Sequence, residues 1–404
     1  MSLNDTPSGE RTQIAFFGVR NAGKSSLVNA VTGQQLAVVS DVAGTTTDPV
    51  RKAMELLPLG PVVIVDTPGI DDDGALGELR VATTRKVLTT CDVAVLAVDA
   101  TKGLAPADRE LLALFAERNV PCVVALTKCD LLPEGSESLS EAPGAAAVVQ
   151  TSSTDGTGIT ELKEALAQAG AAKGPEPHLI ADLLEPGDTV VLVVPIDSAA
   201  PKGRLILPQQ QTIRDVLEAA ASALITRDAE LAQTLAKLPE RPRMVVTDSQ
   251  AFGAVARIVP QDTPLTSFSI LFSRYKGNLA LQVAGARAID GLTDESHVLI
   301  CEGCTHHRQC EDIGTVKMPR WVREHTGCYP TFSFTSGGDF PLDLSPYDLV
   351  IHCGGCTLGA RAMRSRIERA GAQGVPITNY GVAIAHMHGI LPRVVAPFPE
   401  CAEA

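Results

Sequence analysis

A glycine-rich segment near the N-terminus, GVRNAGKS at residues 18–25, constrains the fold of this chain more than any other feature. It fits the pattern G-x-x-x-x-G-K-[ST], follows an apolar run at 14–18 and opens a helical segment at 25–32. In such a loop, backbone N–H groups surround phosphate oxygens at the start of a helix. The segment therefore predicts an α/β domain that binds a nucleoside triphosphate.

Each residue type in this loop has a physical reason to be there. Gly18 and Gly23 let the backbone approach the phosphates closely, Lys24 places a charge on the β- and γ-phosphates, and the Ser25 hydroxyl binds Mg²⁺. From this loop we assign to the nucleotide site Gly18, Asn21, Ala22, Gly23, Lys24, Ser25 and Ser26.

Two further motifs follow in the order that a GTPase requires. DTPG at 66–69 ends an apolar run, so Asp66 is expected to hold Mg²⁺ through water and the Gly69 N–H to sense the γ-phosphate. GTTTD at 44–48 lies between the phosphate-binding loop and DTPG, where a switch segment supplies a threonine to Mg²⁺. We choose Thr46, with Thr45 and Thr47 as rivals.

The base is read by TKCD at 127–130, which follows another apolar run. Asp130 is expected to accept hydrogen bonds from the guanine N1–H and exocyclic amine, while the stem of Lys128 covers the base and Thr127 completes the motif. Adenine lacks this pair of donors, so the motif selects GTP over ATP. TSST at 151–154 contributes Ser152 and Ser153 near the guanine O6. Together the motifs predict a GTPase that cycles between GTP and GDP with Mg²⁺.

Two positions bear on how hydrolysis is accelerated. Ile70 follows DTPG, where many GTPases have a glutamine that orients the attacking water. Asn21 and the GTT segment resemble the TrmE/Era-type GTPases, in which these features mark potassium-activated members. The resemblance implies that Asn21 binds K⁺, that hydrolysis is slow without it, and that Lys24, Asn21 and Thr46 carry catalysis. The alternative is that Asn21 only forms a tight turn.

The chain of 404 residues is long enough for two or three domains. Alternating β and α patterns at 12–170 predict a doubly wound parallel sheet in a GTPase domain at 1–172. AAKGPEPH at 171–178 is typical of a linker. A small α/β domain at 179–270 follows, with strands expected at 190–196 and 244–248 and a helix at 211–226. Residues 271–404 form a third, α/β domain in which cysteine and histidine cluster.

The net charge is −13, from 47 acidic and 34 basic residues, which disfavours nucleic acid or an anionic membrane as the main partner. From the polar N-terminus we expect no signal peptide, and no apolar run is long enough to span a bilayer. We therefore expect a cytoplasmic protein, in which the ten cysteines are thiols or metal ligands.

Two apolar runs, HVLIC at 297–301 and DLVIHC at 348–353, each precede a loop rich in metal-ligating residue types. If both are parallel strands of one sheet, the loops emerge on the same edge. The residue chemistry leaves structural zinc and an iron–sulfur cluster nearly even, while burial as plain core cysteines is the weakest reading. The candidate ligands are Cys301, Cys304, His306, His307, His352, Cys353 and Cys356.

The combination of this GTPase domain with Cys304-x-His306 and His352-Cys353-x-x-Cys356 resembles the HydF family of FeFe-hydrogenase maturation GTPases. The resemblance covers essentially the whole chain. It implies a 4Fe–4S cluster on Cys304, Cys353 and Cys356, with one iron left for an exchangeable ligand. For His306, His307 and His352 three roles stay open: a fourth ligand, a hydrogen-bonding neighbour or a plain polar loop residue. It also implies a dimerisation domain at 179–270, a diiron subcluster as cargo, and radical-SAM maturases and apo FeFe-hydrogenase as partners of a homodimer.

Cys301 and Cys310 lie outside that signature. We expect Cys301 to be no ligand, because it ends a strand and its side chain points into the core. The rival function is a GTPase in RNA modification or ribosome assembly with a structural zinc module, which the acidic charge disfavours. A redox enzyme is a third alternative, disfavoured because only one cluster motif is present.

Overall fold

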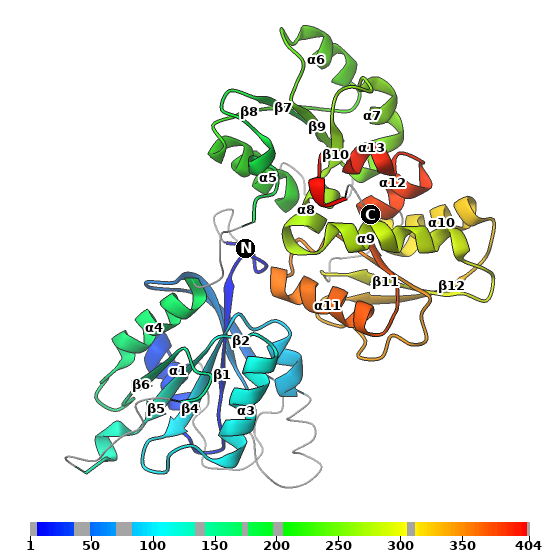
Figure 1. Ribbon diagram of the computed structural model, residues 1–404. Helices are drawn as coiled ribbons and strands as arrows, with labels where there is room; N and C mark the ends of the chain where they lie inside the picture. The colour runs from blue at the N-terminus through cyan, green and yellow to red at the C-terminus, as the bar shows by residue number, and fades with distance from the viewer. Residues whose placement is uncertain are drawn as a thin grey trace. The chain divides into compact units, whose positions relative to one another are not determined.

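The computed structural model describes residues 6–35, 49–69, 83–133, 142–171, 177–196, 205–304 and 312–401. The chain folds into two compact units, Met1–Glu176 and Pro177–Ala404 (Figure 1). Within the described residues, every helix is too short or too polar to cross a membrane.

The first unit is built on a six-stranded sheet in the order β2-β3-β1-β4-β5-β6. All neighbouring strands are parallel except β2, which pairs antiparallel with β3. The strands are β1 (Thr12–Phe17), β2 (Val50–Leu56), β3 (Gly60–Asp66), β4 (Val93–Asp99), β5 (Cys122–Thr127) and β6 (Ala147–Gln150). The main helices are α1 (Lys24–Thr32), α3 (Pro106–Glu117) and α4 (Ile159–Ala171).

Helices cover both faces of this sheet, as the unbroken apolar strands predict. Successive residues along β1 face opposite sides of the sheet. Ile14 and Phe16 pack with α1 and α4, whereas Phe17 packs with α3 (Figure 1). Strands β4 and β5 are buried along their entire length. The loops at the carboxyl ends of the strands are therefore held by a rigid, doubly covered sheet.

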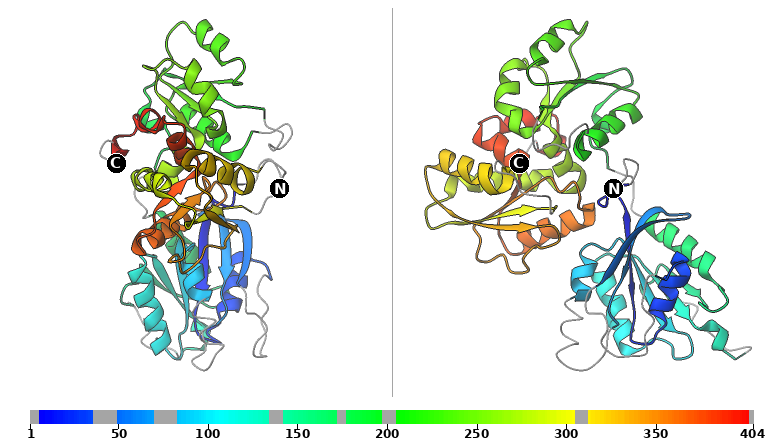
Figure 2. Two further views of the ribbon diagram at one scale, coloured as in Figure 1. Left: turned by 90° about the vertical axis from the view of Figure 1, so that its right-hand side faces the viewer. Right: turned by 180° about the vertical axis from the view of Figure 1, so that it is seen from behind.

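The second unit contains two four-stranded parallel sheets, in the orders β10-β9-β7-β8 and β12-β11-β13-β14 (Figure 2). The strands are β7 (Thr189–Val193), β8 (Ser222–Thr226), β9 (Met244–Thr247), β10 (Leu265–Ser267), β11 (His297–Glu302), β12 (Thr331–Ser336), β13 (Leu349–His352) and β14 (Ile377–Asn379). The helices are α5 (Leu207–Glu218), α6 (Leu231–Lys237), α7 (Phe252–Ile258), α8 (Phe268–Lys276), α9 (Leu279–Ala286), α10 (Met318–Thr326), α11 (Ala360–Ala372), α12 (Tyr380–Met387) and α13 (Leu391–Val395).

One apolar core joins these two sheets. It includes Val191 and Val245 from the first sheet, Ile300 and Ile351 from the second, and helices between them. A separate core lies on the other face of the second sheet, under α11, and contains Leu299, Cys301 and Ile367. The boundary that the sequence suggested after residue 270 falls within α8, so both halves of this unit share a helix as well as a core.

One predicted element differs from the structure. The amphipathic pattern suggested a helix over 211–226, but α5 ends at Glu218 and residues 222–226 form β8. Ala220 takes a left-handed φ of 56° between them, which breaks the helix. The apolar ALIT stretch then pairs in parallel with β7, a long-range contact that outweighs local helical preference.

Gly285 in α9 allows that helix to lie directly against β14. A Cβ atom at this position would stand 2.1 Å from the Ile377 carbonyl oxygen, so the helix and strand would have to separate. We expect Gly285→Ala to destabilise the second unit by about 1–3 kcal/mol, measured by chemical denaturation. Gly371→Ala in α11 is the matched control, because nothing lies within 4 Å of its added Cβ; equal losses in both variants would contradict the packing argument.

Candidate nucleotide site and metal centre

The phosphate-binding loop has the backbone that its glycines predict. Gly23 adopts φ 79° immediately before α1 begins at Lys24. At Gly18 a Cβ atom would lie 2.6 Å from the carbonyl oxygen of Ala97. A side chain at Gly18 would therefore push the loop away from β4.

The DTPG segment lies beside this loop. Lys24 is buried and forms an ion pair with Asp66, the last residue of β3. Thr67 donates a hydrogen bond from Oγ1 to the Phe16 carbonyl oxygen at 2.6 Å. These contacts bring Lys24, which is expected to bind the phosphates, and Asp66, which is expected to hold Mg²⁺, together at the edge of the sheet.

The guanine-recognition segments join the same edge. Thr127 Oγ1 donates to the carbonyl oxygens of Ala22, at 2.6 Å, and Val98, at 3.1 Å. Lys128 Nζ donates to the Asn21 carbonyl oxygen at 2.8 Å, so it bridges TKCD to the phosphate-binding loop. The Cys129 N–H donates to the Thr151 carbonyl oxygen at 3.2 Å and thereby connects TKCD with TSST.

Asp99, at the end of β4, belongs to this arrangement although the sequence analysis did not single it out. Its Oδ2 lies 2.7 Å from Lys128 Nζ, and its Oδ1 accepts from the Thr101 hydroxyl at 2.6 Å. Burial favours a higher pKa, but the hydrogen bonds from Lys128 and Thr101 outweigh it and lower the pKa of Asp99. The ionised carboxylate thus holds the Lys128 stem in place. The only sequence signal was an acidic residue closing an apolar strand.

The remaining assigned residues occupy this edge with different exposures. Asn21 and Asp130 are exposed, Ser152 is buried, and Ser25, Ser26 and Ser153 are partly buried. Asn21 has a left-handed φ of 62°, a conformation that asparagine tolerates in turns. Thr46, Thr45, Thr47 and Ile70 lie outside the described residues.

The two cysteine loops meet as the parallel-strand hypothesis required. Strands β11 and β13 are parallel neighbours, with Cys301 opposite His352. Beyond the strands, the Gly303 N–H donates to Cys353 Sγ at 3.0 Å, and the Gly355 N–H lies 3.4 Å from the same sulfur. Thr357 Oγ1 donates to the Gly303 carbonyl oxygen at 2.8 Å. The loop after β11 and the loop after β13 are therefore held together by hydrogen bonds.

Three thiols, those of Cys304, Cys353 and Cys356, are electrostatically coupled in this region. Burial is the main cause that raises the pKa of Cys353 to about 12; the hydrogen bonds from Gly303 and Gly355 oppose this rise, and the neighbouring Cys356 and Cys304 add to it. Burial also raises the pKa of Cys356, while the charge of Lys276 acts in the opposite direction. The thiols of Cys353 and Cys356 therefore keep their protons at neutral pH unless a metal replaces them. His306, His307 and Cys310 lie outside the described residues.

Lys276, at the end of α8, anchors the loop that follows β13. The side chain is buried, and Nζ donates to the carbonyl oxygens of Cys356 at 3.0 Å and Leu358 at 2.8 Å. Nζ also lies 5.3 Å from the centre of the Phe272 ring. A buried ammonium group therefore fixes the backbone that carries Cys356. No sequence pattern identifies this residue, which is separated from the loop by about 80 positions along the chain.

His352 and Cys301 face the opposite side of the sheet, toward α11. The His352 ring is fully buried, with Nδ1 2.7 Å from the Cys353 carbonyl oxygen and Nε2 2.7 Å from a guanidinium nitrogen of Arg366. Burial, followed by the Arg366 charge, lowers the pKa of His352 to about 3. The neutral ring accepts from Arg366 at Nε2 and donates from Nδ1. Both nitrogens are used, which favours a hydrogen-bonding neighbour over a fourth ligand.

Cys301 is also buried, and its Sγ accepts from the Thr335 hydroxyl at 3.2 Å. It packs in the core under α11, whereas Cys353 and Cys356 pack against the core on the other face. Cys91 and Cys122 are buried in the apolar core of the first unit.

Family models match three stretches of the chain. A model of a 50S ribosome-binding GTPase matches residues 13–128, the Hydrogen maturase F dimerization domain matches 179–277, and the Hydrogen maturase F tetramerization domain matches 280–397. The GTPase fold predicted from the motifs is thus confirmed, together with the two α/β parts that follow it.

Individual relatives resemble the first unit. The tRNA modification GTPase MnmE of Synechococcus sp. (strain JA-3-3Ab) is 36% identical over 168 residues, which are 41% of this chain and 36% of that protein. GTPase Der of Nitratidesulfovibrio vulgaris (strain DP4) is 39% identical over 136 residues, 33% of this chain and 27% of that protein. The chain thus spans about a third of the length of these curated relatives. A structure of Aquifex aeolicus Era with GDP.AlF4⁻ matches with 20% identity and a TM-score of 0.36, covering 61% of this chain and 97% of that one.

The first unit is therefore a P-loop GTPase domain, which binds GTP or GDP with Mg²⁺ and hydrolyses GTP. Dimerization and tetramerization domains of a hydrogenase maturation factor follow it along almost all of the remaining chain. The GTPase domain joined to these two domains shows that the chain belongs to the HydF family of hydrogenase maturation GTPases.

Proposed function

We propose that this chain is a GTP-hydrolysing scaffold that binds a 4Fe–4S cluster through Cys304, Cys353 and Cys356. It receives a diiron subcluster from radical-SAM maturases and delivers that cargo to apo FeFe-hydrogenase. The observation that carries the proposal is the meeting of the CxxC loops of β11 and β13, in a chain of the HydF family. The family membership supplies the maturation pathway, and the loops supply a place for the cluster.

The hydrogen bonds around Cys353 fit an iron–sulfur cluster. Two backbone N–H groups, from Gly303 and Gly355, point at its sulfur, and such bonds stabilise cluster thiolates and adjust the reduction potential. Gly355 adopts φ 62°, and a Cβ atom there would lie 2.6 Å from the sulfur of Met363. The loop is therefore wrapped so closely that only glycine leaves room beside the ligands.

Structural zinc is the alternative occupant of these loops. A structural zinc site is closed by four protein ligands, whereas three cysteines with one exchangeable position suit an iron–sulfur cluster.

The chain's own residues hold and orient the cluster. Cys304, Cys353 and Cys356 supply three thiolates. Lys276 fixes the loop that carries Cys356, and His352 fixes the carbonyl group of Cys353. Three protein ligands leave one iron for an exchangeable ligand. A bound cluster supplies that open iron site and the capacity to take up one electron. We place the homodimer contact within residues 179–270.

The maturation pathway provides the direct test. Chain purified after co-expression with two radical-SAM maturases is expected to activate apo FeFe-hydrogenase, whereas chain expressed alone and reconstituted with iron and sulfide is expected to carry only its own cluster. Iron and sulfide analysis with EPR of the reduced protein measures the cluster. Stoichiometric zinc in place of iron, or no activation by the co-expressed chain, would overturn the proposal.

We further propose that Asn21 binds K⁺ and that hydrolysis is slow without this ion. The exposed side chain lies in the phosphate-binding loop, where a monovalent cation neutralises charge between the phosphates. GTP hydrolysis is expected to be at least about tenfold faster in K⁺ than in Na⁺. Phosphate release in the two salts at equal ionic strength measures the effect.

The variant Asn21→Gly separates ion binding from turn formation. Glycine adopts the φ of 62° at no cost, so the loop is retained while the side-chain amide is lost. Loss of K⁺ activation in this variant is expected. Full K⁺ activation in Asn21→Gly would show that the asparagine serves only the turn.

A further inference from the structure

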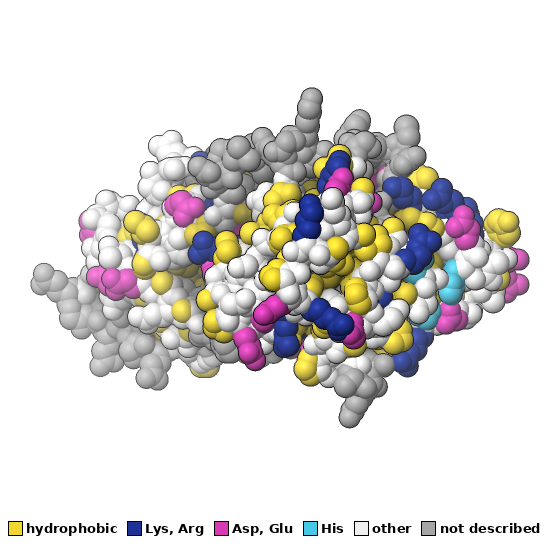
Figure 3. Space-filling model, turned by 90° about the horizontal axis from the view of Figure 1, so that it is seen from above, with side chains coloured by type: hydrophobic (Ala, Val, Ile, Leu, Met, Phe, Trp, Pro, Cys, Tyr) yellow, Lys and Arg dark blue, Asp and Glu magenta, His cyan; other side chains and the backbone are white. Residues whose placement is uncertain are grey.

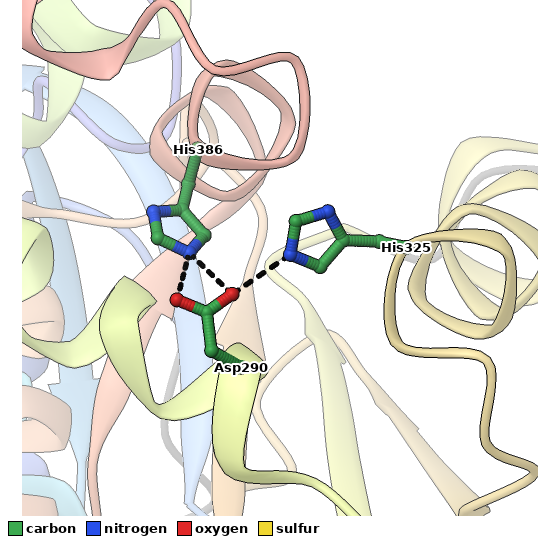
Figure 4. Close-up of side chains that lie close together, drawn as sticks. All are labelled: Asp290, His325 and His386. Carbon is green, nitrogen blue, oxygen red and sulfur yellow. Dashed lines mark hydrogen bonds and ion pairs between the residues drawn. The ribbon is translucent and has the colours of Figure 1, made fainter.

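A trio of ligand-type side chains lies in the second unit, outside the cysteine centre. Asp290 comes from the short helix η4 (Arg287–Gly291), His325 from the last turn of α10, and His386 from the last turn of α12. Their ligand atoms all lie within 4.8 Å of one another. Figure 4 shows the carboxylate of Asp290 between the two imidazole rings, each of which turns a nitrogen toward it.

The contacts within the trio are short and convergent. His325 Nε2 lies 2.8 Å from Asp290 Oδ1. His386 Nε2 lies 3.0 Å from both carboxylate oxygens, and the two imidazole centres are 5.7 Å apart. Both rings thus present the same nitrogen, Nε2, to one carboxylate. Two imidazoles with one carboxylate form a ligand set that divalent transition metals favour.

All three side chains of the trio are partly exposed to solvent. The His325 and His386 side chains are 27% and 16% exposed, while Asp290 is 56% exposed. Histidine side chains reach the surface beside acidic ones on the face drawn in Figure 3. An ion can therefore enter from solvent and keep water in its remaining coordination positions.

A pocket of about 200 Å³ adjoins His325. It is lined by Trp321, Glu324, His325, Ile384, Met387 and His388, which come from α10, α12 and the residue after α12. Glu324 and His388 bring two more ligand-type residues to the neighbourhood of the trio. The pocket gives water or an exchangeable ligand space beside the ion, so the trio has the surroundings of a binding site as well as the ligands.

From this geometry we propose that Asp290, His325 and His386 bind one divalent transition metal ion of the zinc or ferrous type. The ion takes the place of the hydrogen bonds between the two Nε2 atoms and Asp290; each neutral ring then carries its proton on Nδ1 and presents the Nε2 lone pair to the ion. It links η4, α10 and α12, three elements within the stretch matched by the tetramerization model. The site is independent of the cysteine centre and of the proposed maturation function.

The test uses the full chain with Cys304→Ser, Cys353→Ser and Cys356→Ser, so that zinc does not bind to those thiols. After treatment with a chelator, equilibrium dialysis against Zn²⁺ is expected to give one ion per chain. His386→Ala and His325→Ala in this background are expected to weaken binding at least tenfold. His297→Ala is the matched control, because His297 contacts Ser333 at 2.8 Å and lies outside the trio; it is expected to bind zinc normally.

A second readout covers variants whose fold is weakened. Asp290→Asn keeps an oxygen that accepts from one histidine but removes the negative charge. Zinc at 100 times its dissociation constant is expected to raise the Tm of the second unit by roughly 5–10 °C in the background that lacks the three cluster cysteines, and not when Asp290→Asn is added. Failure to take up zinc, or equal affinity and equal Tm shifts in the trio variants, would overturn the proposal.

Discussion

Replacing Lys24 by alanine is expected to lower the rate of GTP hydrolysis by about 100- to 1,000-fold. Lys24 is buried at the start of α1, where the helix N-terminus and the loop N–H groups converge. Its ion pair with Asp66 places the ammonium group where phosphate charge develops. The alanine variant loses that charge and leaves the Asp66 carboxylate without its cation. Phosphate release at saturating GTP, with Mg²⁺ and K⁺, measures the loss.

Lys102→Ala provides the matched control for this prediction. Lys102 belongs to the same unit but its side chain is 73% exposed, and it lies 4.0 Å from Asp99. Its removal changes the net charge equally without touching the phosphate-binding loop, so hydrolysis should remain within about twofold of the wild-type rate. A Tm close to that of the wild type shows that Lys24→Ala is folded. A folded Lys24→Ala variant with wild-type hydrolysis would contradict the placement of this lysine.

The nucleotide site was accessible from sequence because each of its parts is a local motif at a strand end. Lys24, Asp66 and Thr127 each lie at a junction that the apolar runs define. Parallel strands bring their carboxyl ends to one edge, so the order of the motifs predicts their meeting. The same reasoning placed the CxxC loops side by side once HVLIC and DLVIHC were taken as parallel strands.

The features that the sequence did not reveal depend on tertiary contacts. Lys276 lies in α8, and only folding brings its ammonium group under the Cys356 loop. The Arg366–His352 pair joins α11 to β13, and no local pattern identifies a histidine whose two nitrogens are both occupied. Asp290, His325 and His386 come from three separate elements, at no fixed spacing. The strand β8 was missed for a similar reason, since its pairing with β7 is a long-range contact.

Cys353→Ser is expected to abolish the EPR signal of the reduced 4Fe–4S cluster and to reduce bound iron after anaerobic reconstitution to background. Two N–H groups, from Gly303 and Gly355, are directed at the sulfur of Cys353. A serine oxygen is harder and more basic than a thiolate, and it is too short to reach the same position. The site then keeps only the thiols of Cys304 and Cys356, which are too few to hold a cluster.

Cys301→Ala is the informative control, since its position is only two residues before Gly303. Cys301 packs on the opposite face of the sheet, under α11, and its sulfur accepts from Thr335. Its loss costs packing energy but removes no proposed ligand, so iron content and the EPR signal should match the wild type. If Cys301→Ala lost the cluster while Cys353→Ser kept it, the ligand assignment would be reversed. Cys301 and Cys353 pack on opposite faces of the second sheet and therefore make opposite predictions, in line with the expectation that Cys301, at the end of its strand, is no ligand.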